Sequence, residues 1–239
     1  MQKTKLNRFV QKYNLNGNAE QVKWSFRDNV LTTDFVTENK SLKGTVVMDN
    51  ISFEDIDLGV YDTAQLQRLI SVLGEDIKMN VNRVGDKAVS LNIKNGSVSV
   101  DFNLSDLSII PKSAKLKTLP EFNTRVKIDS KFIETFIKGK TALPDSQTFS
   151  ILTHKDVPLI IIGYAATNTN RVNIPVEHTG WDILKPITFS AELFKEILVA
   201  NKECTSALLE VSTAGLARIN FKVDDYDSTY YIAATQEVD

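Results

Sequence analysis

Much of this 239-residue chain alternates between apolar and polar positions with a period of two, which is typical of half-buried β-strands. Residues 22–26 and 218–223 are clear examples. Asn95-Gly96 is a strong tight-turn signal because both residues tolerate a positive φ. The pattern predicts a group of three strands joined by tight turns over 77–102, and a second such group over 207–233.

Four segments instead carry apolar residues at or near the positions i, i+3, i+4 and i+7, which is the pattern of an amphipathic helix. Each would have one apolar face that suits packing on a sheet. For the last two, Ser130 and Ser190 are the candidate N-caps. We expect helices over Thr4–Tyr13, Thr63–Leu73, Lys131–Thr141 and Ala191–Lys202.

The spacing of these helices indicates an internal structural repeat. Leu6 and Leu66 are 60 positions apart, and Phe132 and Leu193 are 61 apart. The second pair follows the first at an offset of 126 to 127 positions. We therefore expect two similar domains of the α+β class, each with two helices packed on antiparallel sheets.

Between the two halves, the segment Asp106–Pro120 has two prolines, three lysines and no clear period. It predicts an extended linker. We place the N-terminal domain at 1–108, the linker at 109–119 and the C-terminal domain at 120–239.

The composition argues against several classes of protein. Hydrophobic residues make up 42% and charged residues 24%, so the chain can bury a core, and the net charge of −2 excludes a strongly basic nucleic-acid binder. The two histidines lack a second ligand at metal spacing, Cys204 is the single cysteine, and no phosphate-binding loop or nucleophile motif occurs. We expect no catalytic residue, no cofactor and no metal site.

The pattern gives no sign of a membrane span or a secretory signal. No run approaches the roughly 18 consecutive apolar residues of a spanning helix. The first residues lack the apolar core of a signal peptide. We expect a protein that stays in the cytoplasm and has no membrane partner.

The faces of the four helices that lie opposite the apolar residues carry cations, although the protein as a whole is mildly acidic. One interpretation is a shared basic surface; the other is that charged residues cover the wet sides of the helices, as is usual. Glu134 weakens the basic face of the third helix. The cations are Lys5, Arg8, Lys12, Arg68, Lys131, Lys138, Lys195 and Lys202.

Two stretches carry a resemblance to a known family. Asp57-Leu58-Gly59-Val60-Tyr61-Asp62 leads directly into the helical run Gln65–Ile70, and three strand-like runs close the chain from Ala207 to Ala233. In these features the sequence resembles the DNA sliding clamps, most closely the clamp of T-even-type bacteriophages.

The resemblance implies a DNA-clamp fold and a homotrimeric ring with helices around the central hole. It implies that the eight cations face double-stranded DNA without reading its sequence. The protein would be a processivity factor for a DNA polymerase, loaded by an ATP-dependent clamp loader, and would not be an enzyme. In such a phage it would act in the cytoplasm of the host cell.

The resemblance also implies two protein-binding regions. The subunit interface would pair 97–103 of one chain with 171–176 of the next, through Val98, Val100, Phe102, Val172, Ile174 and Val176. A peptide of the polymerase or another partner would bind beside the linker at Leu107, Ile109, Ile110, Pro111 and Ile232. The alternatives are ordinary edge strands and a linker held on its own domain.

Three other functions stay open. A monomeric polymerase accessory subunit of the same fold would bind DNA by charge alone, and a phage tail or baseplate protein would have no use for the lysine faces. An enzyme could use Asp224, Asp225 and Asp227 to bind a metal ion, although these residues suit a hairpin turn.

Overall fold

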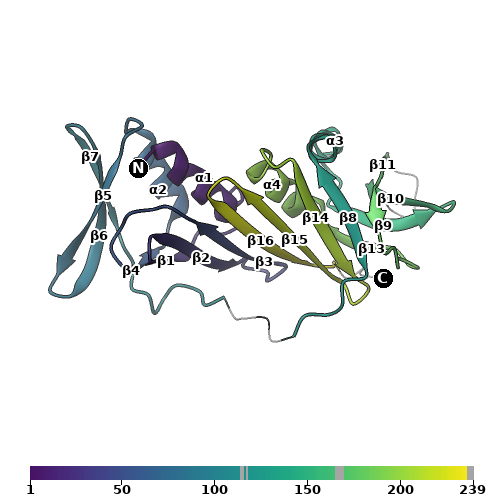
Figure 1. Cartoon of the computed structure of the whole chain (residues 1–239), viewed down its shortest axis with the longest axis horizontal. Coiled ribbons are helices and arrows are strands. Elements are labelled where there is room, and N and C mark those ends of the chain that lie inside the picture. The colour runs from purple at the N-terminus through teal and green to yellow at the C-terminus, as the bar shows by residue number, and fades with distance from the viewer. Residues whose placement is uncertain (114–115, 117, 165–169, 236–239) are drawn as a thin grey trace. The chain divides into compact units, whose positions relative to one another are not determined.

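The computed structural model describes residues 1–113, 116, 118–164 and 170–235 (Figure 1). The chain forms two compact units. Unit 1 comprises Met1–Glu38, Gly44–Ala114 and Asp224–Ser228, and unit 2 comprises Asn39–Lys43, Lys115–Val223 and Thr229–Asp239. Each unit thus contains a short segment from the other half of the sequence, and the domain boundaries proposed above stay a prediction.

Unit 1 contains two helices and two groups of strands. Its strands pair in the orders β3-β2-β1-β4 and β5-β6-β7, and the pairs β1–β2, β1–β4, β5–β6 and β6–β7 are antiparallel. The elements are α1 (Lys3–Asn14), β1 (Val22–Arg27), β2 (Val30–Val36), β3 (Leu42–Met48), β4 (Ile56–Val60), α2 (Thr63–Ser71), β5 (Lys78–Val84), β6 (Lys87–Asn95) and β7 (Val98–Asn103).

The apolar face of α1 packs on strand β1. Phe9 and Tyr13 meet Trp24 of β1 edge to face, with ring centroids 5.8 and 6.5 Å apart. The Tyr13 hydroxyl also lies 3.2 Å from Oγ1 of Thr63, at the start of α2. Because one face of α1 is buried in this way, its opposite face is the one left to carry charge.

Unit 2 repeats this composition of helices on antiparallel strands. Its strands pair in the orders β12-β8-β14-β15-β16 and β11-β10-β9-β13. The elements are β8 (Thr124–Asp129), α3 (Ser130–Ala142), β9 (Thr148–His154), β10 (Val157–Ile162), β11 (Val172–Pro175), β12 (His178–Thr179), β13 (Ile187–Ser190), α4 (Ala191–Ala200), β14 (Ser206–Ser212), β15 (Leu216–Val223) and β16 (Tyr226–Ala233).

A cluster of phenylalanines forms the centre of unit 2. The ring centroid of Phe194 of α4 lies 4.8 Å from those of Phe136 of α3 and Phe149 of β9. All three side chains are fully buried. The two helices and strand β9 therefore share one core, and the predicted α+β class is confirmed.

The four predicted helices are confirmed, with differences at their ends. Asp129, not Ser130, is the N-cap of α3, because its carboxylate accepts a hydrogen bond of 2.8 Å from the Phe132 amide. Helix α4 ends at Ala200, two residues before Lys202. Lys202 therefore lies outside the helix, contrary to the prediction. Buried Asn201 follows the helix, and its side chain donates hydrogen bonds to the Ile197 carbonyl and the Tyr230 hydroxyl.

The predicted strands over 77–102 and 207–233 are also confirmed, with Gly96 at a φ of 56° in the turn between β6 and β7. Part of the predicted linker, residues 114, 115 and 117, lies outside the described residues.

Candidate nucleic-acid interface

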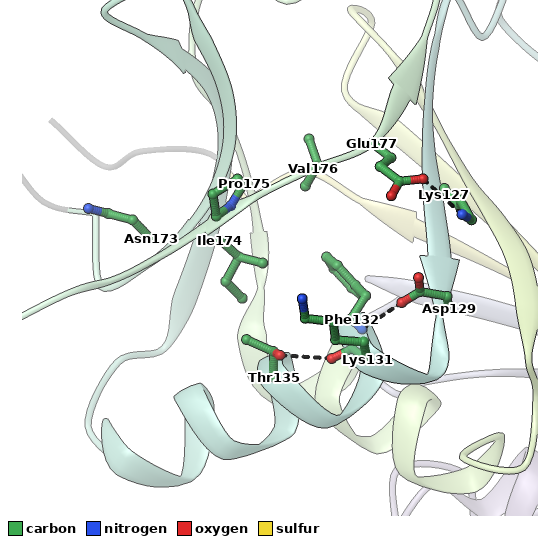
Figure 2. Close-up of a pocket in the computed structure, with 10 residues that line it drawn as sticks. All are labelled: Lys127, Asp129, Lys131, Phe132, Thr135, Asn173, Ile174, Pro175, Val176 and Glu177. Carbon is green, nitrogen blue, oxygen red and sulfur yellow. Dashed lines mark hydrogen bonds and ion pairs between the residues drawn. The ribbon is translucent and has the colours of Figure 1, made fainter.

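A groove of about 280 Å³ lies in unit 2 between helix α3 and the chain that runs from β11 to β12 (Figure 2). Lys131 and Phe132 line it from α3, while Ile174 and Val176 line it from the opposite side. Among the described residues, strand β11 pairs with β10 on one side only, so the other edge of β11 can accept a further strand. This edge includes three of the predicted interface residues, of which Val172 and Val176 are half-buried and Ile174 is buried.

Strand β7 is the corresponding edge strand of unit 1. It is the last strand of the β5-β6-β7 sheet, and Val98 at its start is 48% exposed. Val100 and Phe102 of the same strand are buried, and the Phe102 ring stacks on Tyr61 with ring centroids 5.4 Å apart. Of the three predicted interface residues on β7, only Val98 presents its side chain to solvent.

The predicted DNA-facing residues of α3 differ in their surroundings. Lys131 is exposed beside the groove. The Thr135 hydroxyl donates a hydrogen bond to the backbone carbonyl of Lys131, which does not involve the lysine ammonium. Lys138 is also exposed, but it forms an ion pair with Glu134 one turn away. The hydrogen bond from Lys138 lowers the pKa of Glu134, so this carboxylate stays ionised at neutral pH.

Lys195 on α4 is bound by two carboxylates. Its ammonium lies 2.8 Å from Glu192 and 3.0 Å from Glu196. The hydrogen bond from Lys195 is the main cause that lowers the pKa of Glu192 to about 2, whereas burial raises the pKa of Glu196. Buried Lys140 of α3 also reaches Glu192, at 3.1 Å. Lys202 is exposed in the turn after α4.

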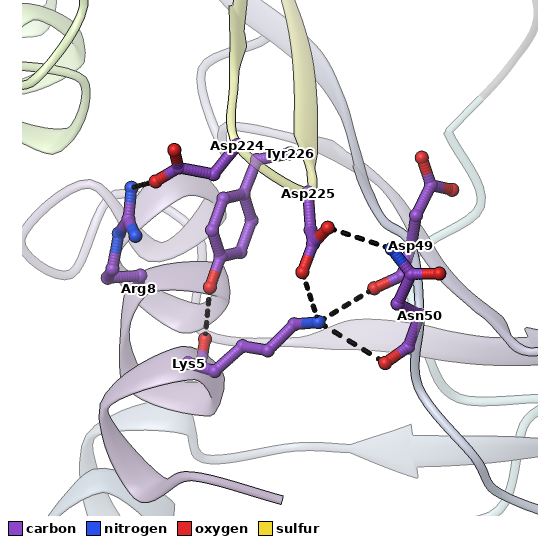
Figure 3. Close-up of polar contacts among 7 residues, drawn as sticks. All are labelled: Lys5, Arg8, Asp49, Asn50, Asp224, Asp225 and Tyr226. Atoms are coloured by element: carbon purple, nitrogen blue, oxygen red, sulfur yellow. Dashed lines mark hydrogen bonds and ion pairs between the residues drawn. The ribbon is translucent and has the colours of Figure 1, made fainter.

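In unit 1, Arg68 is exposed on α2. Lys5 and Arg8 of α1 meet the turn between β15 and β16 (Figure 3). The Lys5 ammonium lies 2.5 Å from Asp225, and the Arg8 guanidinium lies 2.9 Å from Asp224. The Arg8 guanidinium carbon and the Lys12 ammonium lie 4.7 and 5.3 Å from the centre of the Tyr226 ring. Helical periodicity thus predicted correctly that these cations share a face of α1.

The expectation that Lys12 presents its charge on the surface is wrong. Its side chain is only 1% exposed, because it packs beside Tyr226. Lys5 and Arg8 are half-buried. Hydrogen bonds from Lys5 and Asn50 lower the pKa of Asp225, which stays ionised opposite these cations.

The eight cations therefore fall into two sets. Lys5, Arg8, Lys138 and Lys195 are ion-paired, and Lys12 is buried. The other set is exposed, and no carboxylate oxygen of the described residues lies within 4.0 Å of its charged groups. We call this set the open cations: Arg68, Lys131 and Lys202.

The linker residues of unit 1 border a second groove, of about 580 Å³, which we call the linker groove. Leu107, Ile110 and Pro111 line it, whereas Ile109 is 66% exposed and does not. Ile232 belongs to unit 2, is buried, and does not line this groove.

The opposite side of the linker groove consists of polar residues that the sequence analysis missed. They lie on alternate positions of β1, β2 and β4, so the period-two pattern marks them as outward-facing but does not indicate what covers them. They are Lys23, Ser25, Thr32, Asp34 and Asp57.

Among the described residues, no group of three or more His, Cys, Asp or Glu side chains is arranged to hold a metal ion. No helix in this part of the chain has the length and apolar character needed to cross a membrane.

The fold, with helices packed on antiparallel sheets in both units, is that of the PCNA-type sliding clamps. The chain is similar over 99% of its length to proliferating cellular nuclear antigen from Entamoeba histolytica, with 14% identity, a TM-score of 0.74 and 97% of that chain covered. PCNA from A. fulgidus, in a structure with the C-terminal region of FEN-1 bound, is 16% identical with a TM-score of 0.76, covering 100% of this chain and 98% of that one.

A PCNA2–PCNA3 complex from Sulfolobus tokodaii gives a TM-score of 0.72 at 9% identity, covering 98% of this chain and 97% of that chain. No protein-family model and no curated protein matches the sequence. At these identities the comparisons establish the clamp fold.

Proposed function

We propose that this chain is a subunit of a DNA sliding clamp. The observation that carries the proposal is that the clamp fold extends over essentially the whole chain, with TM-scores of 0.72 to 0.76. Cations that are open to solvent on or beside helices of both units support it. They would contact the phosphate backbone of duplex DNA, which carries no sequence information.

The ring would consist of three identical chains. Strand β7 of one chain would add to the free edge of β11 in the next, continuing a sheet through backbone hydrogen bonds. Val98 is the exposed apolar residue at the start of β7, and the groove between α3 and β11 offers Phe132 and Ile174 as apolar partners. A closed ring retains DNA by its topology, so it needs no tight binding.

The clamp would tether a DNA polymerase and so make DNA synthesis processive. A peptide of the polymerase would bind in the linker groove, next to Leu107, Ile110 and Pro111. Placement of the ring on DNA would require an ATP-dependent loader, and the clamp itself would perform no chemistry. The resemblance to the T-even-type clamps would make it a bacteriophage protein that acts in the cytoplasm of the host.

The native mass in solution tests the ring. Light scattering across a dilution series should give three times the 26.7 kDa of the chain at high concentration. A monomer at every concentration would contradict the proposal, because a single chain could not close a ring around a duplex.

A matched pair of variants tests the interface. Val98→Asp should shift the trimer toward monomer, because it places a charge at the strand edge that we propose to be buried. Val84→Asp introduces the same change at a valine that is 72% exposed on β5 of the same sheet, and should leave the trimer intact. Equal effects of the two substitutions would remove β7 from the interface.

A further inference from the structure

The turn between β15 and β16 holds the cations of α1 in a specific arrangement (Figure 3). The Lys5 ammonium donates to Asp225 at 2.5 Å, to the Asp49 carbonyl at 2.9 Å and to the Asn50 carbonyl at 3.2 Å. A lysine ammonium has three N–H donors, so these three acceptors use all of them. A DNA phosphate could bind Lys5 only by displacing one of the acceptors.

The turn is fixed on α1 and on the loop after β3 by further bonds. Tyr226 donates its hydroxyl hydrogen to the Lys5 carbonyl at 2.8 Å, and the Asp49 amide donates to the Asp225 carbonyl at 2.8 Å. Asn50 donates its side-chain amide to Asp225 at 2.8 Å. The acceptors of Lys5 are therefore held in place and are not side chains that meet it by chance.

Arg8 is held in the same way by a charge and a ring. Its guanidinium contacts Asp224 and lies over Tyr226. We call Asp224, Asp225 and Tyr226 the clasp. Arg68, Lys131 and Lys202, by contrast, have no carboxylate partner among the described residues.

We propose that the clasp is an internal competitor for DNA phosphate, which holds Lys5 and Arg8 out of the DNA contact and keeps the affinity of the chain for duplex DNA low. This inference rests on the proposed clamp function. Weak contacts suit a ring that retains DNA by topology, because every tight phosphate contact would have to break when the ring moves.

The test is duplex binding by the full-length Asp224→Asn/Asp225→Asn variant. The probe is a short, fluorescently labelled linear duplex of mixed sequence, onto which a closed ring can pass over the ends, and its anisotropy is followed over a range of salt concentrations. Each released cation that reaches a phosphate should tighten binding about eightfold at ~0.1 M salt, and steepen the plot of log K against log [salt] by about 0.9.

The same substitutions in a Lys5→Gln/Arg8→Gln background separate release of the cations from a general effect of removing negative charge. The proposal expects the gain to vanish in that background. It is overturned if the clasp variant binds no tighter than the wild type, or if the gain persists without Lys5 and Arg8.

Two further measurements keep the outcomes distinct. Asp224 is 65% exposed at its side chain, so Asp224→Asn alone tests the release of Arg8 if the double variant fails to fold. Lys131→Gln/Lys202→Gln tests the proposed function separately. If that variant weakens binding while the clasp variant has no effect, only the clasp inference fails. A monomer at every concentration in light scattering would instead contradict the clamp proposal itself.

Discussion

The division between open and ion-paired cations leads to a quantitative prediction about DNA binding. Replacing Arg68, Lys131 and Lys202 by glutamine removes three positive charges that no described carboxylate neutralises. Each phosphate contact contributes about 0.9 to the slope of log K against log [salt], so loss of all three would lower that slope by about 2.7 for a chain in full contact. At ~0.1 M salt, each lost contact should weaken binding about eightfold.

The matched control removes the same number of charges from the paired set. In Lys5→Gln/Arg8→Gln/Lys195→Gln, every replaced cation had a carboxylate within 3.0 Å. Both triple variants change the net charge by the same amount, so a long-range effect of charge would weaken both equally. We expect a small loss of DNA affinity for the paired set, because its cations already donate hydrogen bonds to carboxylates within the chain.

The assay is the anisotropy of a labelled linear duplex, titrated with each full-length variant at several salt concentrations. Thermal unfolding of each variant confirms that it is folded. Equal slopes for the two triple variants would refute the reasoning that ion pairing within the chain decides which cations contact DNA.

Three further predictions concern stability. Phe194→Ala should cost about 3–5 kcal/mol, measured by urea unfolding, because it empties the centre of the unit 2 core, whereas Val199→Ala on the exposed side of the same helix should change stability by less than about 0.5 kcal/mol. The pKa of Glu192 is lowered to about 2 in the folded protein, so its ion pairs stabilise the folded state fully at pH values above the pKa of an unfolded glutamate, and this stabilisation is lost as the pH falls through about 2. The difference in Tm between the wild type and Glu192→Gln should therefore shrink as the solution is acidified. A difference in Tm that stays constant with pH would contradict this prediction. Gly59→Ala would place its Cβ 2.5 Å from the Ser105 carbonyl oxygen, so we expect the free energy of unfolding to fall by about 1–3 kcal/mol and trypsin to cleave faster at Lys112. Unchanged cleavage would show that this contact does not anchor the linker.

Local pattern determined the secondary structure of this protein. The positions of the four helices follow from apolar residues that recur with the helical period, and the two groups of three strands follow from alternation and turn residues. The shared face of Lys5, Arg8 and Lys12 is likewise a local property, because residues three and four positions apart lie on one side of a helix. The internal repeat was visible for the same reason, as a recurrence of these patterns at a fixed distance.

Only the tertiary structure decided what those cations meet. Asp225 and Asp224 are 220 and 216 positions from Lys5 and Arg8, and nothing in the period of α1 indicates that a turn from the end of the chain will cover it. Lys12 is buried for the same reason. Asn201, the residue that follows α4, donates a hydrogen bond to Tyr230 on β16, and the linker groove is lined by strands that lie far from the linker in sequence. Periodicity assigns a residue to a face; which long-range partner occupies that face depends on how the strands pack, and packing set the charge that the protein presents.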